Sequence, residues 1–161
     1  QNQGNSPISL AVQKGILGDG PIPELLISEY LPGEEFSVDC LCRNGESLLI
    51  LPRLRAKMIN GISVKGEFVN HPQIIKYCHS IIRELRLHGN IGIQVKANSE
   101  GEYTLLEINP RVQGSISAAF GAGVNLPVLA IKQELGLPIL ESDLKVNWGI
   151  RFGRYWQEVF Y

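Results

Sequence analysis

An Asn-Gly pair at positions 44 and 45, between two segments of alternating apolar residues, constrains the fold more than any other feature of the sequence. Apolar side chains occupy every second position before the pair, at Phe36, Val38, Cys40 and Cys42. Such alternation is typical of a β-strand with one buried face, and Asn-Gly is the favoured two-residue turn of a β-hairpin. The predicted pairs of this hairpin are Arg43 with Glu46, Cys40 with Leu49 and Val38 with Leu51.

A second hairpin is predicted between residues 91 and 109, where isoleucine and valine alternate with polar residues. A two-residue turn at 100–101 pairs Gln94 with Glu107 and Val95 with Leu106. A shift of one residue would place Glu107 among the isoleucines, so the register is well specified. The polar face of this hairpin is then formed by Gln94, Lys96, Glu107 and Asn109.

The rest of the chain mixes helical and strand patterns without a regular strand-helix-strand alternation. A helix is expected to begin at His71-Pro72, to carry an apolar stripe and to stop at Gly89. The other expected elements are a short helix near 10–15, helices at 115–122 and 125–135, and strands at 25–30 and 148–161. This arrangement predicts an α+β fold with an antiparallel sheet of hairpins packed against helices.

Composition excludes several functional classes. The chain has 161 residues, of which 44% are apolar and 19% charged, as in an ordinary globular domain with a core. Fifteen Lys and Arg residues balance sixteen Asp and Glu residues, so no basic field attracts nucleic acid or an anionic membrane. No apolar run approaches the length of a transmembrane helix. We therefore expect neither a nucleic-acid partner nor a membrane association.

The ends and the cysteines suggest where the protein works. The chain starts with a polar stretch rather than with Met, so we expect an excerpt of a longer polypeptide without a signal peptide. Its three cysteines form no CxxC pair, and reduced thiols in a cytoplasmic protein are the simplest interpretation.

Oxygen-bearing side chains on the second hairpin suggest a metal site. Gln94, Glu107 and Asn109 share one predicted sheet face, and hard Mg²⁺ prefers carboxylate and amide oxygens. Pro110 ends the strand just before Arg111, which could contact a phosphate through two parallel hydrogen bonds. The alternative is a polar strand face that is simply hydrated.

The segment Leu105-Leu106-Glu107-Ile108-Asn109-Pro110-Arg111, with Gln94 on the neighbouring strand, resembles the metal-binding signature of ATP-grasp enzymes. Within that superfamily it is most similar to the ATP-binding domain of the carbamoyl phosphate synthetase large chain. The resemblance implies that Gln94, Glu107 and Asn109 bind Mg²⁺, with Mn²⁺ as an alternative. It also implies that Arg111 is catalytic, contacting the phosphates or an acyl phosphate.

Residues 26–39, from Leu26 through Pro32-Gly33 to Asp39, resemble the adenine hinge of the same family. The resemblance implies that backbone groups at Glu29 and Leu31 pair with the purine edge of ATP. It also implies that Glu35 accepts the ribose hydroxyls, since a carboxylate can accept two protons at once. Glu34-Glu35 after Pro-Gly could instead be a solvated turn.

A basic stripe formed by Arg53, Arg55 and Lys57 alternates with apolar residues. Arg53 and Arg55 are candidate phosphate or substrate contacts. A solvated strand edge protected by its charge is the alternative. The sequence gives no role to Ser63, Arg151 or Arg154.

The resemblance covers about residues 25–135 and divides the chain in two. Residues 1–24 are expected to be an irregular remnant of the preceding lid subdomain, and residues 25–161 the ATP-grasp C-terminal subdomain, which binds metal and nucleotide. A glycine-rich loop over the phosphates cannot be found: Gly15, Gly18 and Gly20 are followed by Pro-Ile-Pro rather than by a helix. The N-terminal and lid domains of the same chain are therefore expected partners that the sequence lacks.

The resemblance implies that the chain is the ATP- and Mg-binding portion of an ATP-dependent carbon–nitrogen ligase. Such an enzyme activates a carboxylate as an acyl phosphate, which an amine or ammonia then attacks. This portion alone is expected to be inactive, and a homodimer is one assembly it could form. One alternative is a non-catalytic nucleotide-binding or regulatory ATP-grasp module, and another is an α+β domain without a nucleotide role, in which Glu107 and Asn109 face solvent far from Glu35.

Overall fold

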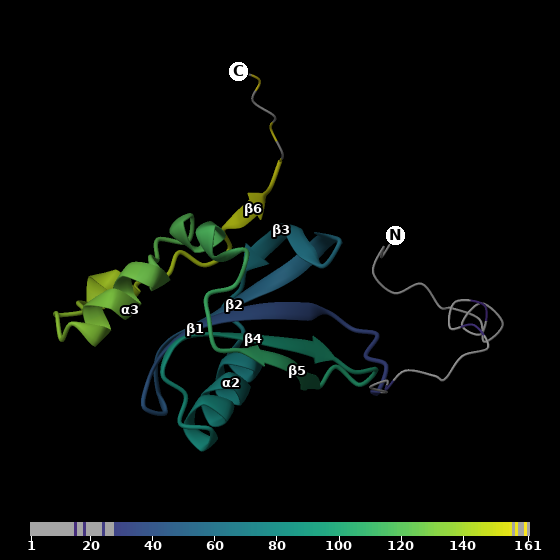
Figure 1. The fold of residues 1–161 in the computed structure, drawn as a ribbon, viewed down its shortest axis with the longest axis horizontal. Coiled ribbons are helices and arrows are strands. Elements are labelled where there is room, and N and C mark those ends of the chain that lie inside the picture. Colours follow the sequence, from purple (N-terminus) through teal and green to yellow (C-terminus); the bar gives the residue numbers. More distant parts are fainter. Residues whose placement is uncertain are drawn as a thin grey trace.

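The structure is a computed structural model that describes residues 28–155 without interruption, together with residues 15, 18, 24, 157 and 160. Its centre is a six-stranded antiparallel sheet in the order β5-β4-β1-β2-β3-β6 (Figure 1). The strands are β1 (Glu35–Arg43), β2 (Glu46–Ile59), β3 (Ile62–Phe68), β4 (Gly89–Ala97), β5 (Tyr103–Asn109) and β6 (Arg151–Gly153). The α+β antiparallel fold expected from the sequence is therefore confirmed.

Helix α2 (Pro72–Glu84) covers one face of the sheet (Figure 1). It buries Ile74, Cys78 and Ile82, three members of the apolar stripe predicted from the sequence, against the strands. The strands contribute the following residues to this core: Phe36, Val38, Cys40, Cys42, Ile50, Ile91, Ile93 and Val95. Helix α2 begins at Pro72, as predicted, because proline suits the first helical turn, where its missing N–H is not needed.

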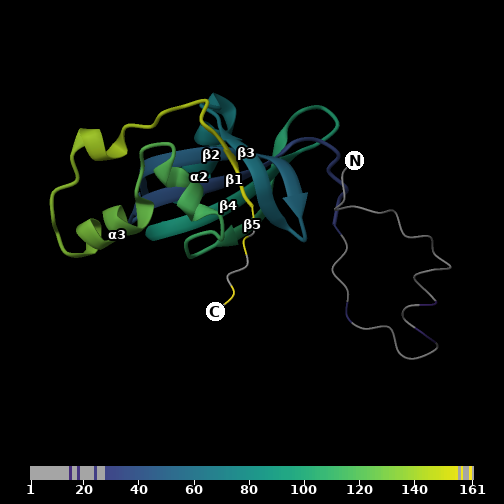
Figure 2. The same ribbon diagram turned by 90° about the horizontal axis from the view of Figure 1, so that it is seen from above.

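The opposite face is covered at one end only. The 3₁₀ helix η1 (Ile116–Phe120), helix α3 (Leu126–Glu134) and the segment containing η2 (Glu141–Leu144) pack over Leu41, Leu49 and Leu51. Figure 2 shows α3 toward one end of the strands. The other end of this face carries polar side chains. Strand β1 is therefore buried on both faces, whereas its alternation had suggested one apolar and one polar face.

The first hairpin departs from the predicted register. Arg43 pairs with Glu46 as expected, but the register shifts between Leu41 and Cys42. Leu48 is the extra residue of β2, and a β-bulge of this kind tightens the local twist of the strand pair. The pairs beyond it are consequently Cys40 with Ile50 and Val38 with Pro52, so the predicted partners Leu49 and Leu51 are wrong by one residue.

The second hairpin contains a bulge of the same kind at Leu106. Gln94 pairs with Glu107, as predicted, whereas Val95 pairs with Leu105 rather than Leu106. Leu106 is 46% exposed. The predicted two-residue turn is wrong, because the Asn98 side chain accepts backbone hydrogen bonds from Glu100 and Glu102 and organises a longer loop. The bulge lets Tyr103 and Leu105 face the core while Glu107 keeps the polar face.

Several predicted boundaries also change. Helix α2 ends before Leu85 rather than at Gly89, which instead begins β4. Helix α3 follows its predicted cap, Asn125, whose side chain accepts a hydrogen bond from the Val128 N–H. The predicted helix at 115–122 is a 3₁₀ turn, and the predicted C-terminal strand shortens to β6. Among the described residues, no helix is long and apolar enough to cross a membrane.

The predicted strand at 25–30 is wrong over its described part, because residues 28–30 are irregular. Residues 25–27 lie outside the described part of the chain, and so does the expected helix near 10–15 apart from its last residue.

A buried ion pair joins the two central strands, on the same sheet face as the polar end and further along β1. Arg53 on β2 is 1% exposed, and its Nη2 donates to Asp39 Oδ2 on β1 at 3.2 Å. Burial raises the pKa of the Asp39 carboxyl, and the Arg53 guanidinium offsets part of that effect. Each charge depends on the other, because an isolated charge in this environment would be strongly destabilising.

We expect Arg53→Met to destabilise the fold by about 3–5 kcal/mol at neutral pH, because it leaves the Asp39 carboxylate buried without its partner. The loss should shrink toward about pH 4, since protonation of a carboxyl with a raised pKa favours the folded state. Urea unfolding at both pH values measures the effect.

The double variant Asp39→Leu/Arg53→Met is the matched control. It removes both charges and should recover most of the lost free energy of unfolding, because no charge remains unpaired. Equal losses in the single and double variants would contradict this account of the pair.

Candidate functional site

Four neighbouring strands bring polar side chains to the open end of one sheet face. Glu35 lies on β1, Arg55 on β2, Gln94 on β4 and Glu107 on β5. The pairing of Gln94 with Glu107, and of Glu35 with Lys96, places these positions side by side. Because side chains at every second position share a face, the register fixed by the hairpins also fixes this cluster.

Glu107 is the shared acceptor at the centre of the cluster. Gln94 Nε2 on the adjacent strand donates to Glu107 Oε1, and Asn109 Nδ2 donates to the same oxygen at 2.7 Å. Arg111 Nη2 reaches Asn109 Oδ1 at 3.5 Å, so the first residue after Pro110 also touches the group. The structure thus brings together Gln94, Glu107, Asn109 and Arg111, four residues that the sequence singled out.

Arg55 connects this group to β1. Its Nη1 donates to Gln94 Oε1 at 2.8 Å and forms an ion pair with Glu35. Its Nε donates to Ser63 Oγ at 3.1 Å, and Nη2 donates to the Gly61 carbonyl. The Arg55 and Glu35 side chains are 7% and 14% exposed, so water screens this pair much less than a surface pair.

The oxygen donors of the cluster suit a hard divalent cation. Glu107 offers a carboxylate, and Gln94 and Asn109 offer amide oxygens, the ligand chemistry that Mg²⁺ accepts beside water and phosphate. Both amides now direct their nitrogens at Glu107, and their oxygens accept from Arg55 and Arg111. Both amides would have to turn, and both arginines to give up these hydrogen bonds, before the amide oxygens could face a metal beside Glu107. Within the described part of the chain, no three His, Cys, Asp or Glu residues group around a point, so a metal here would rely on the amides.

The predicted hinge residues lie in the segment that leads into β1, a few residues before Glu35. Glu29 is exposed in an irregular stretch, and Leu31 is 6% exposed. The segment is then tied to β4, because the Gly33 N–H donates to the Ala97 carbonyl at 2.9 Å. A Cβ on Gly33 would lie 2.6 Å from the Ala97 Cβ, so this close approach requires glycine.

Other predicted or unassigned cations lie outside the cluster. Arg53 is buried against Asp39 on the same face, and its side chain forms hydrogen bonds with Asp39 rather than with Glu107 or Gln94. Arg151 pairs with Glu67 on β3, and Arg154 donates to the Gly114 carbonyl. Arg55 is the member of the predicted stripe that joins the cluster.

Two cluster residues were not predicted as site residues. Lys96 Nζ lies 3.9 Å from Glu35 Oε2, and its position two residues after Gln94 on the same strand was the available signal. Ser63 accepts from Arg55 across the β2–β3 hairpin, and no pattern near Ser63 indicated that contact.

Solved structures similar in fold share little sequence identity with this chain. The biotin carboxylase domain of Hydrogenobacter thermophilus 2-oxoglutarate carboxylase, solved with MgADP, ADP and bicarbonate, matches with a TM-score of 0.58 at 14% identity; 76% of this chain and 29% of that chain are covered. L-amino acid ligase from Bacillus licheniformis matches with a TM-score of 0.55 at 17% identity, covering 73% and 34%. N5-carboxyaminoimidazole synthetase from Staphylococcus aureus, complexed with ADP, matches with a TM-score of 0.56 at 14% identity, covering 74% and 34%.

This chain thus spans about a third of the length of each of these enzymes. No curated protein matches the sequence. A family model described as "ATP-grasp in the biosynthetic pathway with Ter operon" matches residues 21–152, most of the chain. On that match, together with the shared fold, the chain belongs to this ATP-grasp family.

Proposed function

We propose that this chain binds ATP and Mg²⁺ for a ligase that activates a carboxylate as an acyl phosphate, which an amine or ammonia then attacks. The observation that carries the proposal is the convergence of Gln94 and Asn109 on one oxygen of Glu107, with Arg55 and Glu35 continuous with that group. Membership of an ATP-grasp family supports it.

In this proposal Gln94, Glu107 and Asn109 hold the metal. A bound Mg²⁺ would neutralise charge on the triphosphate and orient it. Arg55 borders the metal-binding set, anchored by Glu35 and Ser63, and its hydrogen bond to Gln94 Oε1 would be exchanged for the metal.

The nucleotide would lie along the segment that leads into β1. Backbone groups at Glu29 and Leu31 are proposed to pair with the adenine, and Glu35 is proposed to accept the ribose hydroxyls. Glu35 suits that role because Arg55 and Lys96 keep its carboxylate beside the cluster. The N-terminal and lid domains of a complete ATP-grasp enzyme would close over this surface.

Arg111 is proposed as the catalytic cation. It follows β5 directly, and its contact with Asn109 places it at the edge of the metal-binding set. A guanidinium there could stabilise charge on the transferring phosphoryl group, and phosphoryl transfer depends mostly on such positioning and electrostatics.

We expect Glu107→Gln to weaken Mn²⁺-dependent ADP binding by about 100-fold, because it removes the carboxylate of the metal-binding set. Mn²⁺ replaces Mg²⁺ so that paramagnetic broadening of the NMR signals of residues 94, 107 and 109 reports where the metal sits. Isothermal titration gives the affinity.

Glu100→Gln is the matched control, since Glu100 is an exposed glutamate in the loop of the same hairpin. It should leave both affinity and broadening unchanged. Broadening elsewhere in the chain, or equal affinity of the Glu107→Gln variant, would refute the metal site.

We expect Arg111→Ala to lower the rate of phosphate release by about 100- to 1,000-fold while the affinity for MgADP changes by only a few-fold. A cation that acts on the transferring group affects kcat more than ground-state binding. The measurement is carboxylate- and amine-dependent phosphate release by the protein that contains this chain.

The same assay separates catalysis from regulation. MgADP binding without phosphate release, for every carboxylate and amine tested, would favour a non-catalytic nucleotide-binding module. Absence of MgADP binding would remove both proposals.

A further inference from the structure

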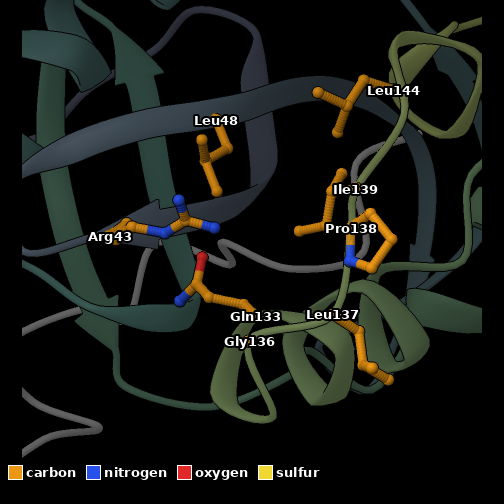
Figure 3. A pocket seen from close by; sticks show the side chains of 8 residues that line it. All are labelled: Arg43, Leu48, Gln133, Gly136, Leu137, Pro138, Ile139 and Leu144. Atoms are coloured by element: carbon orange, nitrogen blue, oxygen red, sulfur yellow. The ribbon is translucent and has the colours of Figure 1, made fainter.

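A concave site lies at the far end of the sheet from the Glu107 cluster. A cavity of about 470 Å³ opens between the end of β1, the end of α3 and the segment that follows α3 (Figure 3). Its volume falls within the range of small-molecule pockets, about 300–1,000 Å³. The residues that line it are Arg43, Leu48, Gln133, Gly136, Leu137, Pro138, Ile139 and Leu144.

The Gln133 carboxamide is held in one orientation. Gln133 is 9% exposed, and its Nε2 donates to the Cys42 carbonyl at 2.9 Å. A flipped amide would direct its oxygen at that carbonyl oxygen, so the bond fixes Oε1 on the other side. Figure 3 shows Oε1 pointing toward the Arg43 guanidinium. Oε1 is buried and has no hydrogen-bond partner among the described residues, which is costly for an amide oxygen.

Arg43 supplies a positive charge beside that oxygen. It is the exposed last residue of β1, and within the described part of the chain no carboxylate lies within 4 Å to form an ion pair with it. A long side chain at a strand end can change rotamer at little cost, so Arg43 can move toward a ligand and uncover Oε1.

The opposite wall of the cavity is apolar. Figure 3 shows Leu144, Ile139 and Pro138 facing Arg43 and Gln133 across the opening. Leu48 adds to the apolar lining, and it is there because the bulge in β2 leaves it outside the regular pairing. A ligand here therefore needs a polar end and an apolar body.

We propose that this cavity binds an α-amino acid with an apolar side chain. The carboxylate of the ligand pairs with Arg43, its ammonium group donates to Gln133 Oε1, and its side chain packs against Ile139 and Leu144. The nitrogen side of this amide is occupied by Glu134, whose Oε1 lies 3.3 Å from Gln133 Nε2, so the amide oxygen is the atom left for the ligand. A hydrogen bond from His88, followed by one from Gln133, lowers the pKa of Glu134 and keeps it charged.

This site is separate from the proposed nucleotide site. Arg43 and Glu35 stand at opposite ends of β1, eight residues or about 26 Å apart along an extended strand. An amino acid bound near Arg43 cannot touch Gln94 or Glu107. The inference therefore does not depend on the proposed ligase activity.

The test is an NMR titration of the ¹⁵N-labelled chain with L-leucine. We expect saturable shifts of the Gln133 side-chain amide and of the Gly136 and Leu137 backbone amides. 4-Methylpentanoate and isoamylamine, which lack the ammonium and the carboxylate respectively, should each bind at least about tenfold more weakly, as expected when one charged contact is lost.

Arg43→Ala should lower the affinity for L-leucine at least about tenfold, while Arg83→Ala should not change it. Arg83 is a suitable control because it is an exposed arginine on α2 that does not line the cavity. No saturable shift up to about 10 mM, well above a millimolar dissociation constant, overturns the proposal. Equal affinity of the Arg43→Ala variant, or an unmoved Gln133 amide signal, overturns it as well.

Discussion

The backbone pairing of β1 with both β2 and β4 is the constraint on which the other features of this domain depend. Strand β1 lies in the middle of the sheet, hydrogen-bonded along both edges and buried on both faces for most of its length. A strand in that position cannot shift without breaking two ladders and two apolar cores at once. It therefore serves as the fixed reference from which α2, α3 and the polar cluster are placed.

Burial on both faces also determines what the polar residues of β1 must do. Asp39 cannot reach water and is compensated by Arg53, whereas Glu35, four residues earlier, lies where helix cover ends and meets Arg55. One strand thus carries two carboxylate–arginine pairs with different environments. The inner pair holds β1 and β2 together, and the outer pair belongs to the surface proposed to bind nucleotide.

The sequence predicts the local features well because each rests on a short-range signal. The turn at Asn44-Gly45, the start of α2 at Pro72 and the cap of α3 at Asn125 all depend on neighbouring residues. The pairing of Gln94 with Glu107 was also predictable, because both alternating patterns demanded it. The bulges at Leu48 and Leu106 could not be predicted, because the alternation of apolar and polar residues does not indicate which residue will lack a partner on the neighbouring strand.

The same distinction holds for the candidate site. Proximity of Gln94, Glu107 and Asn109 follows from the hairpin register and could be read from the sequence. The different environments of Arg53 and Arg55 could not be predicted from the sequence, because the two arginines occupy equivalent positions in one alternating stripe. They differ only in the carboxylate that strand β1 places beside each, which is Asp39 for Arg53 and Glu35 for Arg55. Tertiary pairing, rather than residue type, decides which arginine is sealed in the interior.

The extra residue at Leu106 has a consequence for how this hairpin can change in evolution. Residues 98–102 form a loop whose length is free to vary, because additions there leave the phase of β5 unaltered. Loss of one residue between 103 and 106 would remove the bulge and leave an uninterrupted ladder, in which Glu107 still pairs with Gln94 on the polar face. Length changes among homologues should accordingly gather in the loop and at the bulge, where a missing residue gives a regular strand that keeps the same carboxylate opposite position 94.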